Sequence, residues 1–283
     1  MGEPLTLPRL SIVIVTYNSR AHIDRCLSSL VEHPPAIDHE IAVVDNASTD
    51  GTAADIRQRW TGARVIDAGA NLGFARANNL GIQQTSGGLI LLLNPDTIVP
   101  AGALDRLIAA LEARPDAAIA GPRLVNGDGR PELSFGPMLS PLSELRQKVL
   151  VRGGEHGFAP LAAYLGWLTR QPRDVDWVSG ACMLVRRADA EAAGLMDERF
   201  FMYVEDVDFC AAVRARGRKV LFAPAAEIVH FRGQSRATAA APTERAYRRS
   251  QIAFYEKHHP RWAPALRLYL KMRGRLPDKS IKP

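Results

Sequence analysis

Short apolar blocks alternate with polar segments along the first hundred residues. Three blocks are unbroken and rich in leucine or β-branched residues, as is typical of strands buried on both faces of a sheet: 10–15, 40–44 and 89–93. A shorter strand is predicted at 63–66, and helices are predicted between the strands. The first helix has the clearest apolar face, with helical spacing of Ile23, Cys26, Leu27, Leu30 and Val31. Repeated strand–helix units predict a mostly parallel α/β sheet.

The strand from Leu89 to Leu93 is the most apolar and is expected in the middle of this sheet. It stops abruptly at Asn94-Pro95-Asp96. Ligands of open α/β sheets bind beyond the carboxyl ends of such strands, which places Asp96 at a ligand crevice. Polar residues also follow the neighbouring strands and are expected at the same edge: Thr16, Asn18, Asp45 and Asn46. Alternatively, Asn-Pro-Asp is only a turn, because all three residues favour turns.

The second half of the chain is less regular. Helices are predicted at 103–113, 144–151 and 161–168, and strands at 117–120, 175–185, 219–224 and 227–230. Ser179-Gly180 interrupts the strand 175–185, and a glycine within a strand often marks the close approach of a ligand or another backbone. Asn-Gly and Asp-Gly pairs at 126–129 indicate a hairpin and hence some antiparallel strands. We interpret 138–174 as an insertion over the crevice, 232–242 as a loop, and 243–258 as a helix capped by Thr243.

An aromatic and acidic segment begins at Phe200. Glu205, Asp206 and Asp208 are predicted in the first turn of a helix that ends near Gly217. Acids at a helix N-terminus stabilise the helix dipole by about 0.3–1 kcal/mol each, which explains one or two of them. Three acids directly behind an aromatic run favour a functional site instead.

Composition narrows the class of protein. The apolar content is 47% and the charged content is 23%, as in ordinary globular proteins. The sequence has no apolar window of about 20 residues and no recognisable signal peptide. The three cysteines are scattered, which favours a reducing, cytoplasmic compartment over a disulfide framework or zinc site.

Positive charge is concentrated at the end of the chain. Residues 243–283 contain 11 Lys/Arg and 3 Asp/Glu, so the rest of the chain is nearly neutral and is not expected to bind nucleic acid. Residues 259–283 form a basic amphipathic tail suited to peripheral contact with an anionic membrane. A solvated helix packed on its own domain is the alternative.

The strands lack the usual phosphate-binding loops. Neither Gly-x-Gly-x-x-Gly nor Gly-x-x-x-x-Gly-Lys-Ser/Thr follows any of them. A nucleotide bound at this sheet would therefore be held in another way.

Six motifs in order resemble family 2 glycosyltransferases with the GT-A fold, closest to the rhamnosyltransferase-like branch. They are Thr-Tyr-Asn at 16–18, Asp-Asn-Ala-Ser-Thr-Asp-Gly at 45–51, Asn-Leu-Gly-Phe-Ala-x-Ala-Asn-Asn at 71–79, Leu-Leu-Asn-Pro-Asp at 92–96, Phe-x-Tyr-x-Glu-Asp-x-Asp at 201–208 and His-x-x-Gly-x-Ser at 230–235. The resemblance implies one GT-A domain over 1–258, with a Rossmann-like, mostly parallel sheet covered by helices and a mixed or antiparallel portion on the acceptor side. Within it, a nucleotide-binding half would span about 8–100 and an acceptor half about 101–258.

The resemblance also implies roles for single residues. The donor nucleotide sugar would be bound by Thr16, Asn18, Asp45, Asn46, Asn71, Gly73, Arg76, Asn78 and Asn94. Asp96 matches the last acid of the family's Asp-x-Asp metal motif, whose first position is Asn94 here, so one carboxylate is missing. His230 and diphosphate oxygens would complete the shell of Mn²⁺ or Mg²⁺, with the nitrogen ligand favouring Mn²⁺.

The implied reaction is inverting transfer of a sugar, L-rhamnose from dTDP-L-rhamnose, to a saccharide or lipid-linked saccharide in cell-surface polysaccharide synthesis. Asp206 would be the general base, because an aspartate is ionised at neutral pH, with Glu205 assisting. Trp177 and Tyr203 are candidates for contact with the acceptor sugar, or are plain core residues. The implied location is cytoplasmic, with peripheral contact at the inner membrane face.

Two other classes of protein compete with this interpretation. A non-catalytic binding homologue is favoured by Asn94 but opposed by the intact Glu205-Asp206 pair and His230. A nucleotidylyltransferase would need a Gly-rich basic loop where Thr16-Tyr17-Asn18 stands. Transfer of another hexose also remains open.

Overall fold

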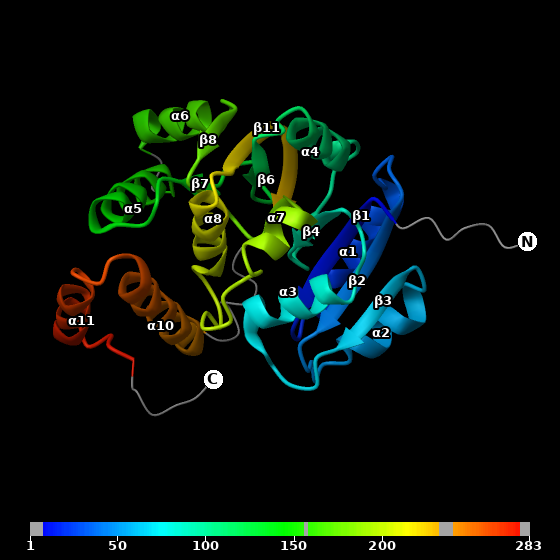
Figure 1. Ribbon diagram of the computed structural model, residues 1–283, viewed down its shortest axis with the longest axis horizontal. Coiled ribbons are helices and arrows are strands. Elements are labelled where there is room, and N and C mark those ends of the chain that lie inside the picture. The colour runs from blue at the N-terminus through cyan, green and yellow to red at the C-terminus, as the bar shows by residue number, and fades with distance from the viewer. Residues whose placement is uncertain (1–7, 156–157, 232–239, 278–283) are drawn as a thin grey trace, which may run out of the picture.

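A mixed sheet forms the centre of the molecule, a computed structural model that describes residues 8–155, 158–231 and 240–277 (Figure 1). Its nine strands run in the order β3-β2-β1-β4-β10-β6-β11-β5, with β8 paired to β11. The strands are β1 (Leu10–Thr16), β2 (His39–Asp45), β3 (Ala63–Asp67), β4 (Leu89–Leu93), β5 (Thr97–Ile98), β6 (Ala117–Val125), β8 (Arg173–Val175), β10 (Cys182–Arg186) and β11 (Lys219–His230). A separate pair joins β7 (Phe135–Gly136) to β9 (Trp177–Val178).

Strand direction explains why distant segments share one edge of the sheet. Strands β1, β2, β3 and β4 pair in parallel. Strand β10 is antiparallel to both β4 and β6, and β11 is parallel to β6. The carboxyl ends of β11 and β4 therefore lie at the same edge of the sheet. The predicted sheet, mostly parallel with an antiparallel portion, is confirmed.

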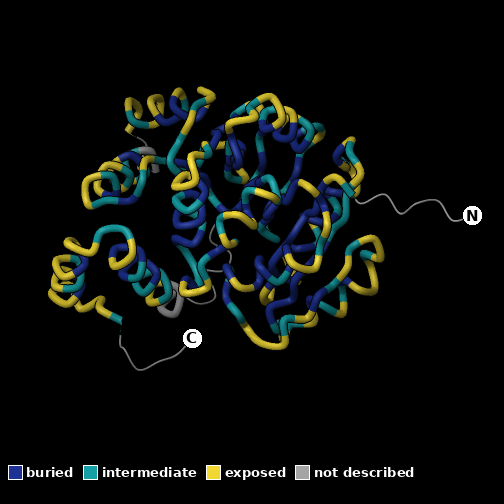
Figure 2. The backbone as a smooth tube through the Cα atoms, in the orientation of Figure 1, coloured by how far each residue is buried: buried dark blue, intermediate teal, exposed yellow. Residues whose placement is uncertain are grey.

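Helices cover both faces of the sheet. They are α1 (Arg20–Glu32), α2 (Thr52–Arg59), α3 (Gly73–Gln83), α4 (Ala103–Glu112), α5 (Pro141–Glu155), α6 (Ala159–Leu168), α7 (Arg187–Ala192), α8 (Glu205–Ala215), α10 (Ala240–His258) and α11 (Ala263–Met272). Ile12 and Ile14 of β1 belong to one core with α1, α2 and α4, whereas Val13 and Val15 belong to another with α3, α8 and α10. All of β1 and β4 is buried, as the dark tube in Figure 2 shows. Burial on both faces is the physical reason for their unbroken apolar sequences.

Some predicted boundaries were wrong. The interruption predicted at Ser179-Gly180 is confirmed, because β9 ends at Val178 and β10 begins at Cys182. The segment before it is two strands rather than one, because β8 pairs with β11 and β9 pairs with β7. Strand β6 continues to Val125 beside β11, and β11 itself is continuous through a bulge between Ala223 and Glu227. The turn at 126–129 leads to a single antiparallel bridge rather than a hairpin of two strands. Val31, expected on the apolar face of α1, is 62% exposed.

Helices α5, α6, α10 and α11 gather at one end of the molecule, beside α8 (Figure 1). Helix α5 is joined to α10 through the buried Glu144, which accepts hydrogen bonds from Gln251 Nε2 and Tyr255 Oη, both at 2.7 Å. Helix α11 packs against α10. Most of the predicted loop, 232–239, lies outside the described residues, and α10 begins before Thr243, which is therefore not its cap. None of the described helices is long and apolar enough to cross a membrane.

Candidate active site

Asp96 and His230 meet beyond the ends of β4 and β11. Strand β5 pairs antiparallel with the end of β11, which sets His230 opposite Thr97. His230 Nε2 lies 3.4 Å from Asp96 Oδ1, and Nδ1 lies 3.1 Å from Glu132 Oε2. An imidazole is thus held between two largely buried carboxylates.

The surroundings of His230 strongly favour its charged form. Burial lowers the pKa of the imidazole, but hydrogen bonds and charge from Asp96 and Glu132 outweigh burial and raise the pKa to about 9. An imidazole nitrogen binds a metal only after losing its proton, so a proton and a cation compete for Nε2.

These residues fit a cation that is shared with a substrate. No group of three or more His, Cys, Asp or Glu side chains in the described part of the chain is arranged to bind a metal. Asp96 and His230 offer one oxygen and one nitrogen, and a Mg²⁺-type ion is commonly bound by one or two carboxylates together with substrate phosphates. Glu132 is placed as the outer partner that metal-binding histidines usually have. Sequence reasoning missed Glu132, which has no motif of its own.

The three acids at the start of α8 have three different environments. Asp206 is partly exposed, and its Oδ2 accepts the Gly180 N–H at 2.9 Å. Asp208 is 1% exposed and is bound by Lys257 Nζ at 2.8 Å and His258 Nε2 at 2.6 Å, which fix α10 to α8. Asp208 is therefore structural, whereas Asp206 is partly exposed and accepts backbone N–H groups from Gly180 and Val207.

Glu205 is buried beside Asp206. Within the described part of the chain, its Oε2 has no hydrogen-bond partner. Burial, and then the charge of Asp206, raise the pKa of the Glu205 carboxyl well above its ordinary value. Burial therefore favours the neutral form of Glu205.

The aromatic segment before α8 is strained and braced by α10. Tyr203 and Val204 have φ values of 69° and 70°, a left-handed conformation that costs non-glycine residues about 1–3 kcal/mol each. Ser250 Oγ donates to Met202 O at 2.7 Å, and the Tyr203 ring packs edge-on against Tyr247 at 5.9 Å. Such strain is typical of active sites.

Trp177, the other aromatic candidate, lies in the core. It is 7% exposed, and its Nε1 donates to Pro137 O at 2.9 Å. This environment fits the core alternative rather than a ring that stacks on a sugar.

On the nucleotide side, Thr16 and Asp45 lie opposite each other at the ends of β1 and β2. Both are buried, and in the described part of the chain Thr16 Oγ1 and Asp45 Oδ1 have no hydrogen-bond partner. A buried unpaired polar atom costs about 1–3 kcal/mol, so these atoms are suited to a ligand that supplies the missing partners. Asn18 (φ 49°) accepts the Thr49 N–H at 2.8 Å and so holds the loop after β2.

The other predicted nucleotide residues mainly order the loop before α3. Asn46 Nδ2 donates to Asn71 Oδ1 at 3.0 Å and to Gly73 O at 3.3 Å. Asn78 is buried and donates to Phe74 O within α3. Arg76 Nε lies 3.2 Å from Glu198 Oε2, at the surface.

Hydrogen bonds connect these separate parts into one region. Phe74 N donates to Phe201 O at 2.7 Å, and Asn94 N donates to Ala181 O at 2.9 Å. Gly180, next to Ala181, lies between the Phe74 ring and Asp206, where an added Cβ would be 3.2 Å from the ring and 3.4 Å from Asp206 Cβ. The structure thus brings the starts of α3 and α8 to the ends of β4 and β9.

We expect Gly73→Ala to lower the free energy of unfolding by about 2–4 kcal/mol, measured by urea denaturation. Gly73 has φ +79°, and an added Cβ would lie 2.3 Å from Phe201 O, so the backbone contact between the two loops must open. Gly69→Ala is the matched control, because Gly69 has φ +74° and nothing within 4 Å of an added Cβ. Equal losses in both variants would mean that the contact with Phe201 contributes nothing.

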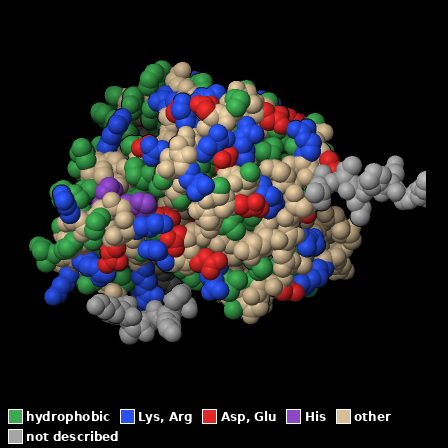
Figure 3. Space-filling view, in the orientation of Figure 1, with side chains coloured by type: hydrophobic (Ala, Val, Ile, Leu, Met, Phe, Trp, Pro, Cys, Tyr) green, Lys and Arg blue, Asp and Glu red, His purple; other side chains and the backbone are tan. Residues whose placement is uncertain are grey.

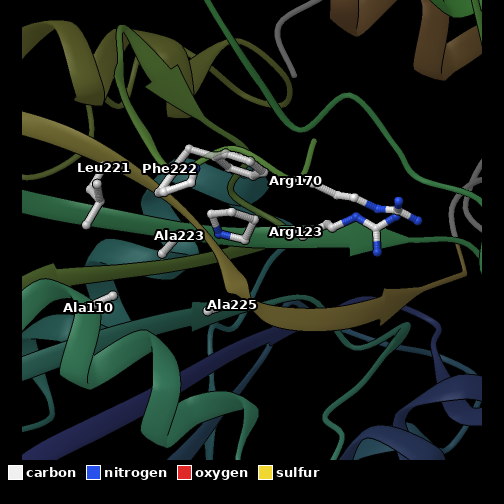
Figure 4. A pocket seen from close by; sticks show the side chains of 9 residues that line it. Ala110, Arg123, Arg170, Leu221, Phe222, Ala223 and Ala225 are labelled. Carbon is white, nitrogen blue, oxygen red and sulfur yellow. The ribbon is translucent and has the colours of Figure 1, made fainter. Parts of the chain in front are cut away.

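A hollow of about 380 Å³ lies elsewhere, on the side of the sheet toward α4 (Figure 4). Leu221, Phe222 and Ala223 of β11 line it, with Arg123 and Arg170 extending beside it. None of the predicted site residues contributes to it.

Comparison with known proteins places this arrangement in a family. Residues 11–164 match the model of glycosyl transferase family 2. The mannosyltransferase PcManGT from Pyrobaculum calidifontis, solved in complex with GDP-Man and Mn²⁺, superposes with a TM-score of 0.61 at 18% identity, covering 94% of this chain and 70% of that one. The chain belongs to glycosyl transferase family 2 and is a glycosyltransferase with the GT-A fold.

Its relatives point to one branch of the family. The N-acetylglucosaminyl-diphospho-decaprenol L-rhamnosyltransferase of Mycobacterium tuberculosis is 33% identical, over 96% of this chain and 93% of the relative. The rhamnosyltransferase WbbL of Escherichia coli is 25% identical, over 78% and 82%. The predicted likeness to rhamnosyltransferases is confirmed.

Proposed function

We propose that this glycosyltransferase moves L-rhamnose from dTDP-L-rhamnose to a hydroxyl of a lipid-linked saccharide, with inversion at the anomeric carbon. The observation that supports the proposal is the chain of contacts that links Asp206 to the Asp96–His230 pair. Gly180 N–H binds the partly exposed Asp206, and the next residue, Ala181, accepts the N–H of Asn94, two residues before Asp96. The acceptor oxygen would bond to the anomeric carbon as the bond to the diphosphate breaks. Asp206 would take the hydroxyl proton, and dTDP would leave.

The donor nucleotide would lie across the ends of β1 and β2. The orphaned oxygens of Thr16 and Asp45 support this, since a base or ribose offers the partners they lack. The nucleotide pocket would be shaped by four residues of the loops after β1, after β2 and before α3: Asn18, Asn46, Asn71 and Gly73. Asn94, after β4, would lie beside the diphosphate. Arg76 and Asn78 would complete the pocket from α3. Of these, Asn78 would act through the helix, because its amide is bonded to Phe74.

A divalent cation, Mn²⁺ or Mg²⁺, would be bound by Asp96 and His230 and would neutralise charge on the leaving diphosphate. Glu132 would keep the His230 ring in position through Nδ1, leaving Nε2 for the cation. The mannosyltransferase of the same fold was solved with Mn²⁺, which supports this choice of ion.

The acceptor would bind on the α8 side of the crevice. The mycobacterial relative is named for a lipid-linked acceptor, N-acetylglucosaminyl-diphospho-decaprenol, which supports an acceptor of that class. The reaction would then serve cell-surface polysaccharide synthesis at the cytoplasmic face of a membrane. Tyr203 is the aromatic candidate for sugar contact, because Trp177 is 7% exposed. Glu205 would serve the reaction indirectly, as a neutral neighbour of Asp206.

A panel of nucleotide sugars tested by thermal unfolding would identify the donor. We expect dTDP-L-rhamnose with Mn²⁺, at about 100 times its Kd, to stabilise the protein by about 2.7 kcal/mol and raise Tm by about 5 °C. dTDP-glucose and UDP-glucose are the controls for the sugar and the base. Greater stabilisation by either control would assign the enzyme to another hexose.

A further inference from the structure

An exposed stripe of large apolar side chains runs along α11. The opposite face of this helix packs on the protein, since Ala263 and Leu270 are buried. Leu268, Tyr269 and Met272 are 60%, 55% and 80% exposed, and their spacing places them on one side of the helix. An ordinary surface helix would carry polar residues there.

Helix α5 repeats this arrangement at the same end of the molecule. Leu142, Leu145 and Val149, spaced at i, i+3 and i+7, are 77%, 60% and 55% exposed. Next to them, Phe158 and Trp167 at the two ends of α6 are 58% and 55% exposed. Figure 3 shows hydrophobic side chains interspersed with Lys and Arg along this end of the molecule. We call the exposed apolar residues of α5, α6 and α11 the apolar rim.

The charged residues around the apolar rim are mostly positive. Residues 141–155 and 259–277 include two acids, Glu144 and Glu155, and eight Lys or Arg: Arg146, Lys148, Arg152, Arg261, Arg267, Lys271, Arg273 and Arg275. Glu144 is buried and bonded to α10. Two of the arginines form ion pairs with acids of α10, Arg267 with Glu256 and Arg275 with Glu244, so Lys271 and Arg273 are the cations of α11 on which the test relies. On a helical projection, Arg146 and Arg152 flank the α5 stripe, and Lys271 and Arg273 flank the α11 stripe.

These features fit a lipid surface better than a protein partner. Lysine is depleted in protein interfaces, and a two-fold contact between copies would set one basic rim against another. Exposed leucine and aromatic side chains with flanking cations are the usual composition of helices that lie in the headgroup region of anionic membranes.

We infer that the apolar rim of α5, α6 and α11 docks the protein on an anionic membrane surface. The basic amphipathic tail predicted from the sequence supplies α11, and the structure adds α5 and α6. Because α10 connects this end to the segment before α8, docking would hold Asp206 close to the membrane. That docking brings Asp206 close to a lipid-linked acceptor rests on the proposed function, whereas the inference of membrane binding does not depend on it.

Co-sedimentation of the full chain with vesicles tests the inference. We expect binding to vesicles of phosphatidylcholine mixed with phosphatidylglycerol, weaker binding at higher salt, and little binding to phosphatidylcholine alone. Lys271→Glu/Arg273→Glu should reduce partitioning at least about tenfold, and Leu268→Ser/Met272→Ser should also reduce it. Arg57→Glu/Arg59→Glu, with the same change of net charge on exposed α2 residues away from this end, should bind as the parent does.

Three results would overturn the inference: equal binding to neutral and anionic vesicles, an equal loss in the α2 control, or no binding at all. A dimer that the α11 variants abolish, without vesicle binding, would assign the rim to self-association. Unchanged thermal unfolding would verify that the variants fold. Because the test measures vesicle binding, its result does not depend on whether the proposed transferase reaction is correct. In the Lys271→Glu/Arg273→Glu variant, transfer to a short water-soluble acceptor should be unchanged, because neither residue lies in the proposed active site.

Discussion

Asp206→Asn is expected to lower kcat by about 10²–10⁴-fold and to leave the donor Kd within a few-fold. The asparagine side chain has nearly the same shape, and its Oδ1 can keep one of the two backbone hydrogen bonds that Asp206 accepts, from Gly180 N–H at 2.9 Å and from Val207 N–H at 2.8 Å. The backbone should therefore keep its local path, while the group that accepts the hydroxyl proton is lost. Product formation measured by mass spectrometry, with donor binding measured by calorimetry, separates the two effects.

Asp208→Asn is the matched control, two residues along the same helix. Asp208 is buried and bound to Lys257 and His258, so its loss should reduce the free energy of unfolding by about 1–3 kcal/mol with a far smaller effect on kcat. Unchanged turnover in Asp206→Asn would exclude Asp206 as the base. If Glu205→Gln instead abolished transfer while Asp206→Asn did not, the role would pass to Glu205.

Asp96→Ala should weaken donor binding about 10²-fold in Mn²⁺, and the remaining binding should no longer respond to the cation. Asp96 Oδ1 lies 3.4 Å from His230 Nε2, so its removal takes away one of the two protein atoms suited to the ion. Titration of dTDP-L-rhamnose in Mn²⁺ and in chelator, for both proteins, measures this difference.

Asp128→Ala controls for the loss of one negative charge near this edge, because Asp128 is exposed in the turn after β6. It should bind the donor as the parent does. Full activity of the parent in chelator would refute the cation's role, and Asp96 would then have to act through His230 alone.

Much of the fold follows from local sequence. The runs Leu10–Val15 and Leu89–Leu93 are apolar throughout because β1 and β4 are covered on both faces. The boundary that failed within 175–185 depends on pairing. The break at Ser179-Gly180 was predicted, but the separation of β8 from β9 follows from their different partners, β11 and β7. The apolar pattern within a strand does not specify which other strand pairs with it.

The sequence by itself determined the strand–helix alternation, the polar strand ends that include Asp96, and the motifs that identify the family, because each depends on residues close together in the chain. Only the tertiary structure decided which side chains share an environment. It placed Glu132 on His230, 98 residues away, separated Asp208 from Asp206 by binding it to α10, and buried Trp177. These outcomes depend on strand order and helix packing, which bring distant residues together and which short-range periodicity does not encode.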